Sequence, residues 1–436
     1  MIYGNKNDII IFKEKENGYM LLDFFKNIVM MLFYILDLYI VLYTIYFFIT
    51  GLFAFKKKNT IRIYKPKHKL AVLIPARNEE KVIKNLIKSL KKQNYPKELY
   101  DIFVIPNNCT DNTEKVSLEL GVYVIKCEIE IKTKGDVLKE TFKYMNEFYS
   151  EYDAYCIFDA DNIVHNNFLN RMNDTLCSGY KVAQGFRDSK NPSDSWISSS
   201  YSLFYLTQNY FFNRARMNLG WSSSINGTGF MISKELINEI GFNTVTITED
   251  IEFAGICAAN NVKIAFVDDA KTYDEQPVTF VKSWKQRMRW SMGTLDCMNK
   301  YSKDLFVTGI KKKIPQAFDM SLFYIAPIIQ IFTIFVFILY IIINMLDIQV
   351  VNIVKNVIDN RGIYIIFGYV TCVLLSLLVL KLQKKSIRKS LKGVFTLAIF
   401  MITWIPINFI CLFKKEQKWE QIEHECTLEI EHITEK

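Results

Sequence analysis

The sequence predicts an α/β domain built on a mostly parallel central sheet, with transmembrane helices before and after it. Short apolar runs alternate with helix-like stretches between about residues 68 and 165, a pattern typical of parallel sheets. Apolar blocks long enough to cross a bilayer lie on both sides of this region. Hydrophobic residues make up 50% of the chain and aromatic residues 14%, and this surplus is concentrated in those blocks.

The first apolar block predicts a transmembrane helix over residues 28–55. It follows an N-terminal segment, residues 1–27, which is mixed in composition and does not resemble a cleaved signal peptide. The block is long enough to span, because about 20 apolar residues suffice. Lysine and arginine crowd positions 56–69, and by the positive-inside rule they place the following domain in the cytoplasm.

Residues 60–315 are expected to form that cytoplasmic domain. Its first half predicts strands at 70–75, 102–105 and 122–125, a further strand ending at Asp159, and helices at 80–90, 113–120 and 135–148. Ligands of such sheets bind at the carboxyl ends of the strands, where the loops 76–79, 107–111 and 159–161 lie. Neither a G-x-G-x-x-G fingerprint nor a Walker A loop is present in the sequence.

Asp159 and Asp161 follow the most apolar of these strands. Alternate residues of an extended chain point the same way, so both acids are expected to face one site at the strand end. Paired carboxylates suit Mg²⁺ or Mn²⁺, which also take ligands from substrate phosphates. An isolated Asp-x-Asp is equally an ordinary turn after a buried strand, and these residues alone leave both interpretations open.

Two later motifs carry further candidates. Thr248-Glu-Asp250 opens a predicted helix over 250–259, and a capping box of Thr246 with Glu249 is the structural alternative. Gln286-Arg-Met-Arg-Trp290 lies in the basic, aromatic stretch 280–297. As an amphipathic helix, that stretch could simply lie on a membrane surface.

Residues 320–413 are expected to form a C-terminal membrane region, followed by a polar tail, residues 414–436. Its apolar segments are 320–346, 363–380 and 393–413. With the first block, four full crossings would place the tail outside, whereas its lysines favour the cytoplasm. The last segment contains Trp404, Pro406 and Asn408, so a re-entrant or interfacial course stays open.

Composition narrows the class of protein. The net charge of +9 comes largely from residues at the ends of apolar blocks, which favours membrane lipid over nucleic acid as the partner. Nine cysteines show no C-x-x-C spacing and only four histidines are present, so neither a zinc site nor a disulfide framework is expected. This usage suits a reduced compartment.

Several short motifs, in a fixed order between about residues 70 and 290, together resemble the membrane-bound family 2 glycosyltransferases. That group holds the cellulose, chitin, hyaluronan and poly-N-acetylglucosamine synthases. The motifs are Ile74-Pro-Ala-Arg-Asn-Glu-Glu80, Asn107-Asn-Cys-Thr-Asp-Asn-Thr113, Lys134-Gly-Asp136, Asp159-Ala-Asp161, Thr248-Glu-Asp250 and Gln286-Arg-Met-Arg-Trp290. The resemblance implies a GT-A-like nucleotide-sugar-binding domain.

The resemblance also implies roles for individual residues. Asp250 would be the catalytic base, with Glu249 beside it, and Asp161 and Asp159 would hold Mg²⁺ or Mn²⁺. The implied donor-binding residues are Pro75, Ala76, Glu79, Asn107, Lys134, Asp159 and Asp161. Gln286, Arg289 and Trp290 would bind the acceptor and the diphosphate. One departure is Asn107, which stands where many members have an acid that contacts uracil.

These residues together predict an inverting, metal-dependent glycosyltransferase. It would transfer a hexose or N-acetylhexosamine from a UDP-sugar to a growing β-linked polysaccharide at the membrane. The alternatives are a single transfer to a lipid or short saccharide acceptor, and a non-catalytic membrane scaffold with a nucleotide-binding fold. The expected partners are the UDP-sugar, the saccharide or lipid acceptor and membrane lipid; a partner subunit or homo-oligomer stays open, and nucleic acid is not expected.

Overall fold

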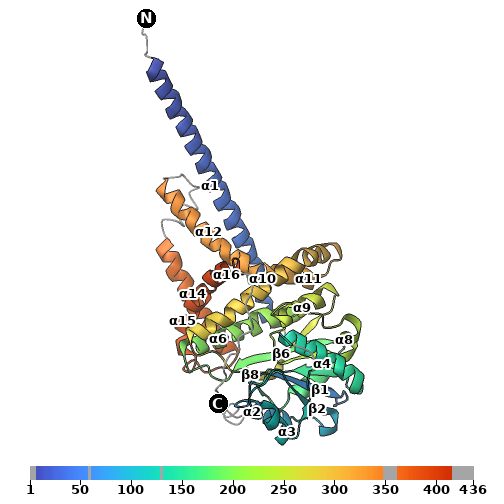
Figure 1. Ribbon diagram of the computed structural model, residues 1–436. Helices are drawn as coiled ribbons and strands as arrows, with labels where there is room; N and C mark the ends of the chain where they lie inside the picture. Colours follow the sequence, from blue (N-terminus) through green and yellow to red (C-terminus); the bar gives the residue numbers. More distant parts are fainter. Residues whose placement is uncertain (1–5, 57–59, 128–130, 347–360, 415–436) are drawn as a thin grey trace. The chain divides into compact units, whose positions relative to one another are not determined.

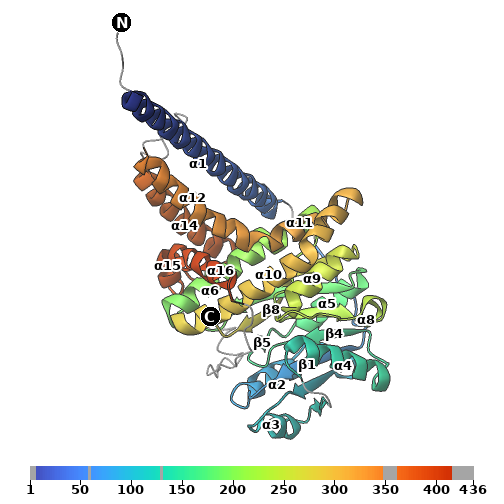
Figure 2. The same cartoon turned by 45° about the horizontal axis from the view of Figure 1, so that its top comes forward.

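The computed structural model describes residues 6–56, 60–127, 131–346 and 361–414. The chain divides into two units, of which the first comprises Met1–Phe47 with Ile328–Val370. The second comprises Phe48–Pro327 with Thr371–Lys436. Figures 1 and 2 show the ribbon from two directions. Each unit is described by itself.

The first unit is built from long apolar helices. α1 spans Lys6–Leu52 and therefore begins well before the apolar block, whereas α12 covers Ala326–Met345. Val29 and Phe33 of α1 are buried with Ile343 of α12, so the two helices pack against each other. Within the described residues, four stretches are long and apolar enough to cross a membrane: Met20–Phe55, Ala326–Met345, Ile365–Leu382 and Leu391–Cys411.

The second unit contains an eight-stranded mixed sheet in the order β3-β2-β1-β4-β7-β6-β8-β5. Its strands are β1 (Leu70–Ala76), β2 (Tyr100–Pro106), β3 (Tyr123–Val124), β4 (Ala154–Ile157), β5 (Ile163–Val164), β6 (Val182–Ser189), β7 (Phe230–Ser233) and β8 (Ile264–Asp274). β1 pairs in parallel with both β2 and β4, and β2 pairs in parallel with β3. Antiparallel pairing begins at β7, so the predicted mostly parallel sheet is confirmed for the half that the sequence pattern covered.

The sheet separates two cores, because strand side chains alternate between its faces. In β1, Leu70, Val72 and Ile74 pack with the apolar residues of α2 (Ile83–Lys91) and α5 (Phe168–Cys177). Ala71 and Leu73 face the other core, which α4 (Lys134–Phe148), α8 (Lys234–Ile240) and α9 (Glu249–Ala259) cover. A sheet covered on both faces explains why β1 reads as a continuous apolar run.

The remaining helices lie between the strands or after them in sequence. They are α3 (Thr113–Glu119), α6 (Trp196–Thr207), α7 (Ala215–Leu219), α10 (Phe280–Lys311), α11 (Pro315–Tyr324), α14 (Arg361–Leu382), α15 (Leu391–Ile402) and α16 (Trp404–Cys411), with 3-10 turns at Phe53–Phe55 and Lys97–Leu99. A π-helical segment, Gln208–Arg214, joins α6 to α7. α6, α9 and α10 lie beside the β6–β8 half of the sheet in both views (Figures 1 and 2). α10 ends at Lys311, well past the stretch 280–297 that the sequence predicted.

Candidate active site

The loops after β1 and β2 are joined by backbone hydrogen bonds. The amide of Asn107 donates to the carbonyl of Ala76 at 2.8 Å, and the amide of Glu79 donates to Thr113 Oγ1 at 2.8 Å. Asn78 and Asn108 adopt left-handed backbone conformations, which asparagine tolerates better than most residues. This edge of the sheet therefore brings together the predicted donor-binding residues Pro75, Ala76, Glu79 and Asn107.

Lys134 is the centre of a second group of residues. A capping box between Thr133 and Asp136 starts α4 at this lysine, so the helix start positions its side chain. Its Nζ donates to Asp159 Oδ1 at 2.5 Å and to the carbonyl of Gly227 at 2.6 Å. The same Nζ lies 3.8 Å from Glu249 Oε1. The structure thus gathers two predicted site residues, Asp159 and Glu249, around the predicted cation Lys134.

Glu249 and Asp250 occupy the first turn of α9. Thr248 is the N-cap residue, and its side chain makes no capping hydrogen bond. The hydroxyl of Thr246 instead donates to the carbonyl of Thr248, at 3.3 Å. The capping box of Thr246 with Glu249, the structural alternative for this motif, is therefore wrong. Glu252 accepts the amides of the preceding loop, which leaves Glu249 directed toward Lys134.

Burial raises the pKa values of both acids of this motif. The pKa of Glu249 rises to about 7, mainly through burial and further through repulsion by Asp250, although Lys134 opposes the shift. The pKa of Asp250 is also raised by burial, against the favourable fields of the Ile251 amide, Lys134 and two arginines. Burial lowers the pKa of Lys134, but Asp159 and Glu249 more than offset it, so the net shift is upward.

Asp159 and Asp161 do not extend a strand as expected. β4 ends at Ile157, and both acids lie in a turn closed by the amide of Asn162 donating to the carbonyl of Asp159. Asp159 pairs with Lys134, whereas the buried Asp161 accepts from the amide of Glu275 and from Asn162 Nδ2. The turn allows the two carboxylates different partners, which an extended chain would not. No group of three or more His, Cys, Asp or Glu able to hold a metal occurs within the described residues.

Sequence reasoning assigned no role to the loop 226–229, yet this loop touches most of the group. The amide of Asp159 donates to Thr228 Oγ1 at 3.0 Å, and Gly227 accepts from Lys134. A Cβ at Gly227 would lie 3.2 Å from Asp250 Oδ2, and the φ of this residue is +78°. The left-handed backbone therefore favours glycine here, and a Cβ would also crowd the Asp250 carboxylate. The sequence feature that could have indicated this loop is the pair Gly227 and Gly229, directly before the apolar strand β7.

Arg187 and Asp274 were also missed. Arg187 Nε donates to Asp274 Oδ2 at 2.9 Å and its Nη1 to the carbonyl of Asn226 at 2.8 Å. Asp274 Oδ1 accepts from Asn162 Nδ2, the group that also contacts Asp161. Burial raises the pKa of Asp274 to about 6, although the guanidinium opposes this. Arg187 near the end of β6 and Asp274 at the end of β8 therefore hold the Asp161 turn through Asn162. No local sequence pattern predicts this contact.

The Gln286–Trp290 motif lies on α10, in the same unit as Lys134 and the acids. Arg289 is close enough to lower the pKa values of Glu249 and Asp250 by its charge. Trp290 lies on the α6 side, where its ring meets Tyr201 at 6.0 Å and stacks on Trp404 at 6.4 Å between centroids. Gln286 Oε1 is buried without a hydrogen-bond partner in the described part of the chain. The motif thus spans from the acids to an aromatic cluster.

One glycine explains how α9 and α10 approach each other. A Cβ at Gly293 would lie 2.1 Å from Thr248 Oγ1, so only glycine permits this contact. Thr248 immediately precedes Glu249, and Gly293 follows Trp290 by one turn of α10. The close approach therefore fixes the acids relative to the Gln286–Trp290 motif.

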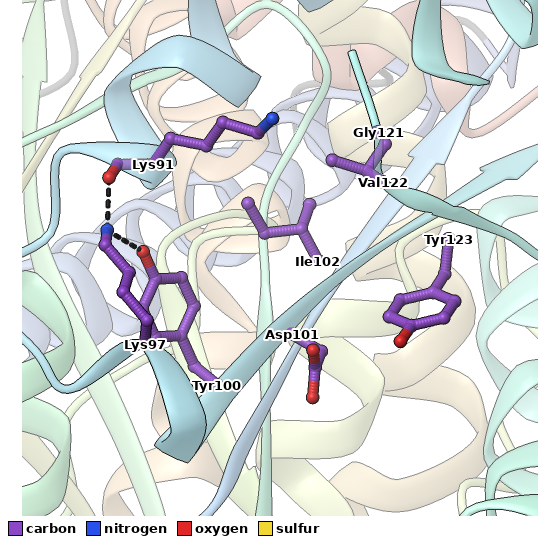
Figure 3. Close-up of a pocket in the computed structure, with 8 residues that line it drawn as sticks. All are labelled: Lys91, Lys97, Tyr100, Asp101, Ile102, Gly121, Val122 and Tyr123. Atoms are coloured by element: carbon purple, nitrogen blue, oxygen red, sulfur yellow. Dashed lines mark hydrogen bonds between the residues drawn. The ribbon is translucent and has the colours of Figure 1, made fainter. Parts of the chain in front are cut away.

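A separate cavity of about 380 Å³ lies away from these groups, near the start of β2. Its lining includes Lys91, Lys97, Tyr100 and Tyr123, as Figure 3 shows. Lys97 Nζ donates to the carbonyl of Lys91 and to Tyr100 OH, so this lysine is already engaged. The cavity is at the amino end of the strands, whereas the candidate site is at their carboxyl ends.

Comparison with known families identifies most of the second unit. Residues 66–293, just over half of the chain, match the family described as "Glycosyltransferase like family 2". The solved mannosyltransferase PcManGT from Pyrobaculum calidifontis, in complex with GDP-Man and Mn²⁺, superposes with a TM-score of 0.57. The superposition covers 85% of this chain and 99% of that chain at 14% identity, a likeness of fold.

Curated relatives act on different acceptors. A probable glycosyltransferase, YdaM, of Bacillus subtilis (strain 168) is 26% identical over 59% of this chain and 61% of its own length. A beta-monoglucosyldiacylglycerol synthase of Nostoc sp. is 23% identical, over 51% and 48%. A poly-beta-1,6-N-acetyl-D-glucosamine synthase of Staphylococcus epidermidis is 22% identical, over 61% and 66%. The alignments therefore cover less than two thirds of each relative.

Proposed function

Because this chain belongs to glycosyltransferase family 2 and has the GT-A fold, we propose that it transfers a sugar from a UDP-sugar with inversion at the anomeric carbon. The observation that carries the proposal is the place of Asp250, half-buried in the first turn of α9 next to Glu249, where desolvation raises its pKa and suits it to act as a general base. It lies in one group with Lys134, Asp159 and Glu249.

In this reaction Asp250 takes the proton from the acceptor hydroxyl. The hydroxyl oxygen forms the new bond to the anomeric carbon as the bond to the UDP oxygen breaks, and UDP leaves with that electron pair. The proton remains on Asp250 until solvent removes it. Lys134 and Arg289 are the cations placed to oppose the charge that grows on the diphosphate.

A divalent cation, Mg²⁺ or Mn²⁺, is part of the proposal. Asp161 and Asp159 supply two carboxylates in one turn, which suits a cation that completes its shell with water and substrate phosphate. When bound, the cation would add positive charge at the leaving diphosphate. Asp274, Asn162 and the Glu275 amide hold the Asp161 carboxylate in place.

The proposed donor is a UDP-hexose or UDP-N-acetylhexosamine, contacted by the loops of Pro75, Ala76, Glu79 and Asn107. The proposed product is a growing β-linked polysaccharide, with Gln286 and Trp290 on the acceptor side. The face of an indole ring stacks well on a sugar ring. A single transfer to a lipid acceptor is the second candidate, because one relative is a glycolipid synthase and another a polysaccharide synthase.

We further propose that residues 60–315 form the catalytic domain and face the cytoplasm from an integral membrane protein. The basic residues that follow the first apolar block support this orientation. Residues 1–27 and 28–55 would precede the domain as the N-terminal segment and first membrane helix. The segment 320–413 would follow as the C-terminal membrane region, and residues 414–436 as the tail.

The test is UDP release by the full-length protein in nanodiscs, measured across a panel of UDP-sugars with and without chelator. Release with one donor that stops on chelation and returns with Mn²⁺ or Mg²⁺ is the expected result. Sizing the product then separates a polymer from a single transfer. UDP binding without release, with saccharide and lipid acceptors both supplied, would favour a non-catalytic scaffold and overturn the proposal.

A further inference from the structure

The fourth apolar stretch is broken into two short helices. α15 covers Leu391–Ile402 and α16 covers Trp404–Cys411, and the junction is Thr403. At about 1.5 Å per residue, α15 is about 18 Å long and α16 about 12 Å. The hydrocarbon core of a bilayer is about 30 Å thick, so neither helix spans it by itself, and Leu391–Cys411 would span it only as one straight helix.

The inner face of this helix pair is fastened to α6 of the catalytic unit. Val394 and Phe400 are buried in the core that holds the α6 side chains. The amide of Gly393 donates to Ser199 Oγ at 2.8 Å, and Ser200 Oγ shares a hydrogen bond with Thr396 Oγ1 at 3.0 Å. A Cβ at Gly393 would come within 2.6 Å of the Ser199 carbonyl, so the two backbones are in direct contact.

Arg287 of α10 closes the end of α15. Its Nη1 donates to the carbonyl of Phe400 at 3.0 Å and to Thr403 Oγ1 at 2.7 Å. The guanidinium carbon lies 4.3 Å from the centroid of the Phe400 ring and 5.2 Å from that of Trp404. A fully buried arginine that caps α15 ties this helix to α10, because a buried guanidinium that lost these partners would be costly.

The outer face is apolar and exposed. Ile399, Ile402 and Phe413 are 53%, 63% and 74% exposed, and Phe395 and Phe409 also point outward. Such a face on a soluble surface marks an interaction site. Exposed basic residues flank it at both ends, namely Lys384, Arg388 and Lys389 before α15, Lys392 in its first turn, and Lys414 after α16.

We propose that α15 and α16 lie in the lipid leaflet on the catalytic domain's side and do not cross the membrane. The occupant of the apolar face is lipid acyl chain, because the pair directly follows the membrane-spanning candidate Ile365–Leu382. The flanking basic residues then meet anionic headgroups. Crossings by Met20–Phe55, Ala326–Met345 and Ile365–Leu382 return the chain to the catalytic side, and the tail stays there.

This proposal does not depend on the reaction and removes the charge conflict in the sequence. Four crossings would put Lys414 and the tail on the side opposite the catalytic domain, against the positive-inside rule. With α15 and α16 in the leaflet, the basic loop before them and the lysines after them share one side. That side is the one that also holds the lysines after the first apolar block.

The first test compares reporter fusions in a bacterial host. GFP and alkaline phosphatase are fused after Lys436 of the full chain, after Lys311 at the end of α10, and after Met345 at the end of α12. We expect the Lys436 and Lys311 fusions to report the same side and the Met345 fusion to report the other. Opposite sides for Lys436 and Lys311 would overturn the proposal, whichever side the catalytic domain occupies.

The second test identifies what covers the outer face. Spin labels are placed by Phe395→Cys and Phe409→Cys in the full chain, in nanodiscs of phosphatidylcholine and phosphatidylglycerol, after reactive native cysteines are replaced by serine. We expect collisions with oxygen to exceed those with a water-soluble nickel chelate, as in acyl chains. The buried Ile407→Cys is the protein-covered control and the exposed Glu119→Cys the aqueous control. Either control pattern at Phe395 and Phe409 would contradict lipid as the occupant.

Discussion

At the scale of single residues, the site is defined by how its charges balance. Glu249 is buried and the adjacent Asp250 is half-buried, and both have raised pKa values. Lys134 pairs with Asp159 and lies near Glu249, so its ammonium group is shared between two acids. A buried acid with a raised pKa accepts a proton more readily near neutral pH.

Replacing Asp250 tests its proposed role as the base directly. Asp250→Asn keeps the size of the side chain but removes the proton acceptor, so we expect transfer to fall by about 10²- to 10⁴-fold. The melting temperature should remain close to that of the wild type. UDP release and thermal melting are measured side by side, with the exposed Asp194→Asn as the control. Turnover at the wild-type rate would exclude Asp250 as the base.

Glu249 gives the protein a specific dependence of stability on pH. Its folded-state pKa is about 7 against an ordinary value of 4.5, so the folded protein holds this proton more tightly than the unfolded chain. The stabilising contribution is complete below about pH 4.5 and is lost as pH rises through about 7. For a shift of this size the loss is on the order of 3 kcal/mol.

The variant Glu249→Gln lacks that contribution at every pH. We therefore expect the melting temperature of the variant, relative to wild type, to rise between pH 5 and pH 8. Glu119→Gln on the exposed side of α3 should show no such trend. A difference that stays constant over this range would mean that Glu249 has no raised pKa in the folded protein.

At the scale of elements, α10 organises the site. It carries Gln286, Arg289 and Trp290, admits α9 at Gly293, and holds α15 through Arg287. One helix thus relates the acids to the aromatic cluster and to the membrane-proximal helices. Changes on α10 away from the reacting atoms are accordingly expected to alter transfer.

Gly293→Ala tests the contact between α9 and α10. The new methyl group would overlap Thr248, so we expect a destabilisation of about 1–3 kcal/mol and displacement of the Glu249–Asp250 turn. Transfer should fall even at temperatures where the variant is fully folded. Gly368→Ala in α14, where nothing lies within 4 Å, is the matched control. Equal activity of the two variants would rule out a positioning role for Gly293.

Arg287→Met tests the attachment of α15. The change leaves the Phe400 carbonyl without its donor, which costs about 1–3 kcal/mol for a buried acceptor. Hydrogen exchange at residues 391–411 should accelerate by about 10- to 100-fold in nanodiscs. Lys285→Met, at an exposed position of α10, should not change it. Unchanged exchange in Arg287→Met would show that the arginine does not hold this helix.

At the scale of the whole molecule, apolar length decides how the protein meets the membrane. α1 and α12 pack through Val29, Phe33 and Ile343, and large apolar side chains such as Phe48 and Phe337 remain exposed. Water would solvate such surfaces poorly, whereas acyl chains would cover them.

The protein is therefore expected to behave as an integral membrane protein. After washing of membranes with high salt and then with carbonate at pH 11, it should stay in the pellet and dissolve only in detergent. Salt release would indicate binding by charge alone, and carbonate release would indicate a peripheral attachment. A known peripheral protein in the same membranes serves as the control.

The sequence by itself determined the features that depend on local pattern. The alternation of apolar runs predicted β1, α2, β2, α3, β3, α4 and β4 in order. The short motifs alone predicted the family that the comparison confirmed. These features are predictable because the spacing of apolar side chains and the loops at strand ends depend only on a few neighbouring residues.

Only the tertiary structure decided which residues meet. Lys134 contacts Asp159 and Gly227 across 25 and 93 positions of sequence, and Arg187 meets Asp274 across 87. In the structure, Asp159 lies in a turn and Thr248, not Thr246, is the N-cap residue of α9. The last apolar segment forms two helices that meet at Thr403. Such contacts depend on the order of the strands in the sheet. They also depend on the close approach of helices at glycines such as Gly293. No local pattern encodes them, because chain folding sets those distances between remote segments.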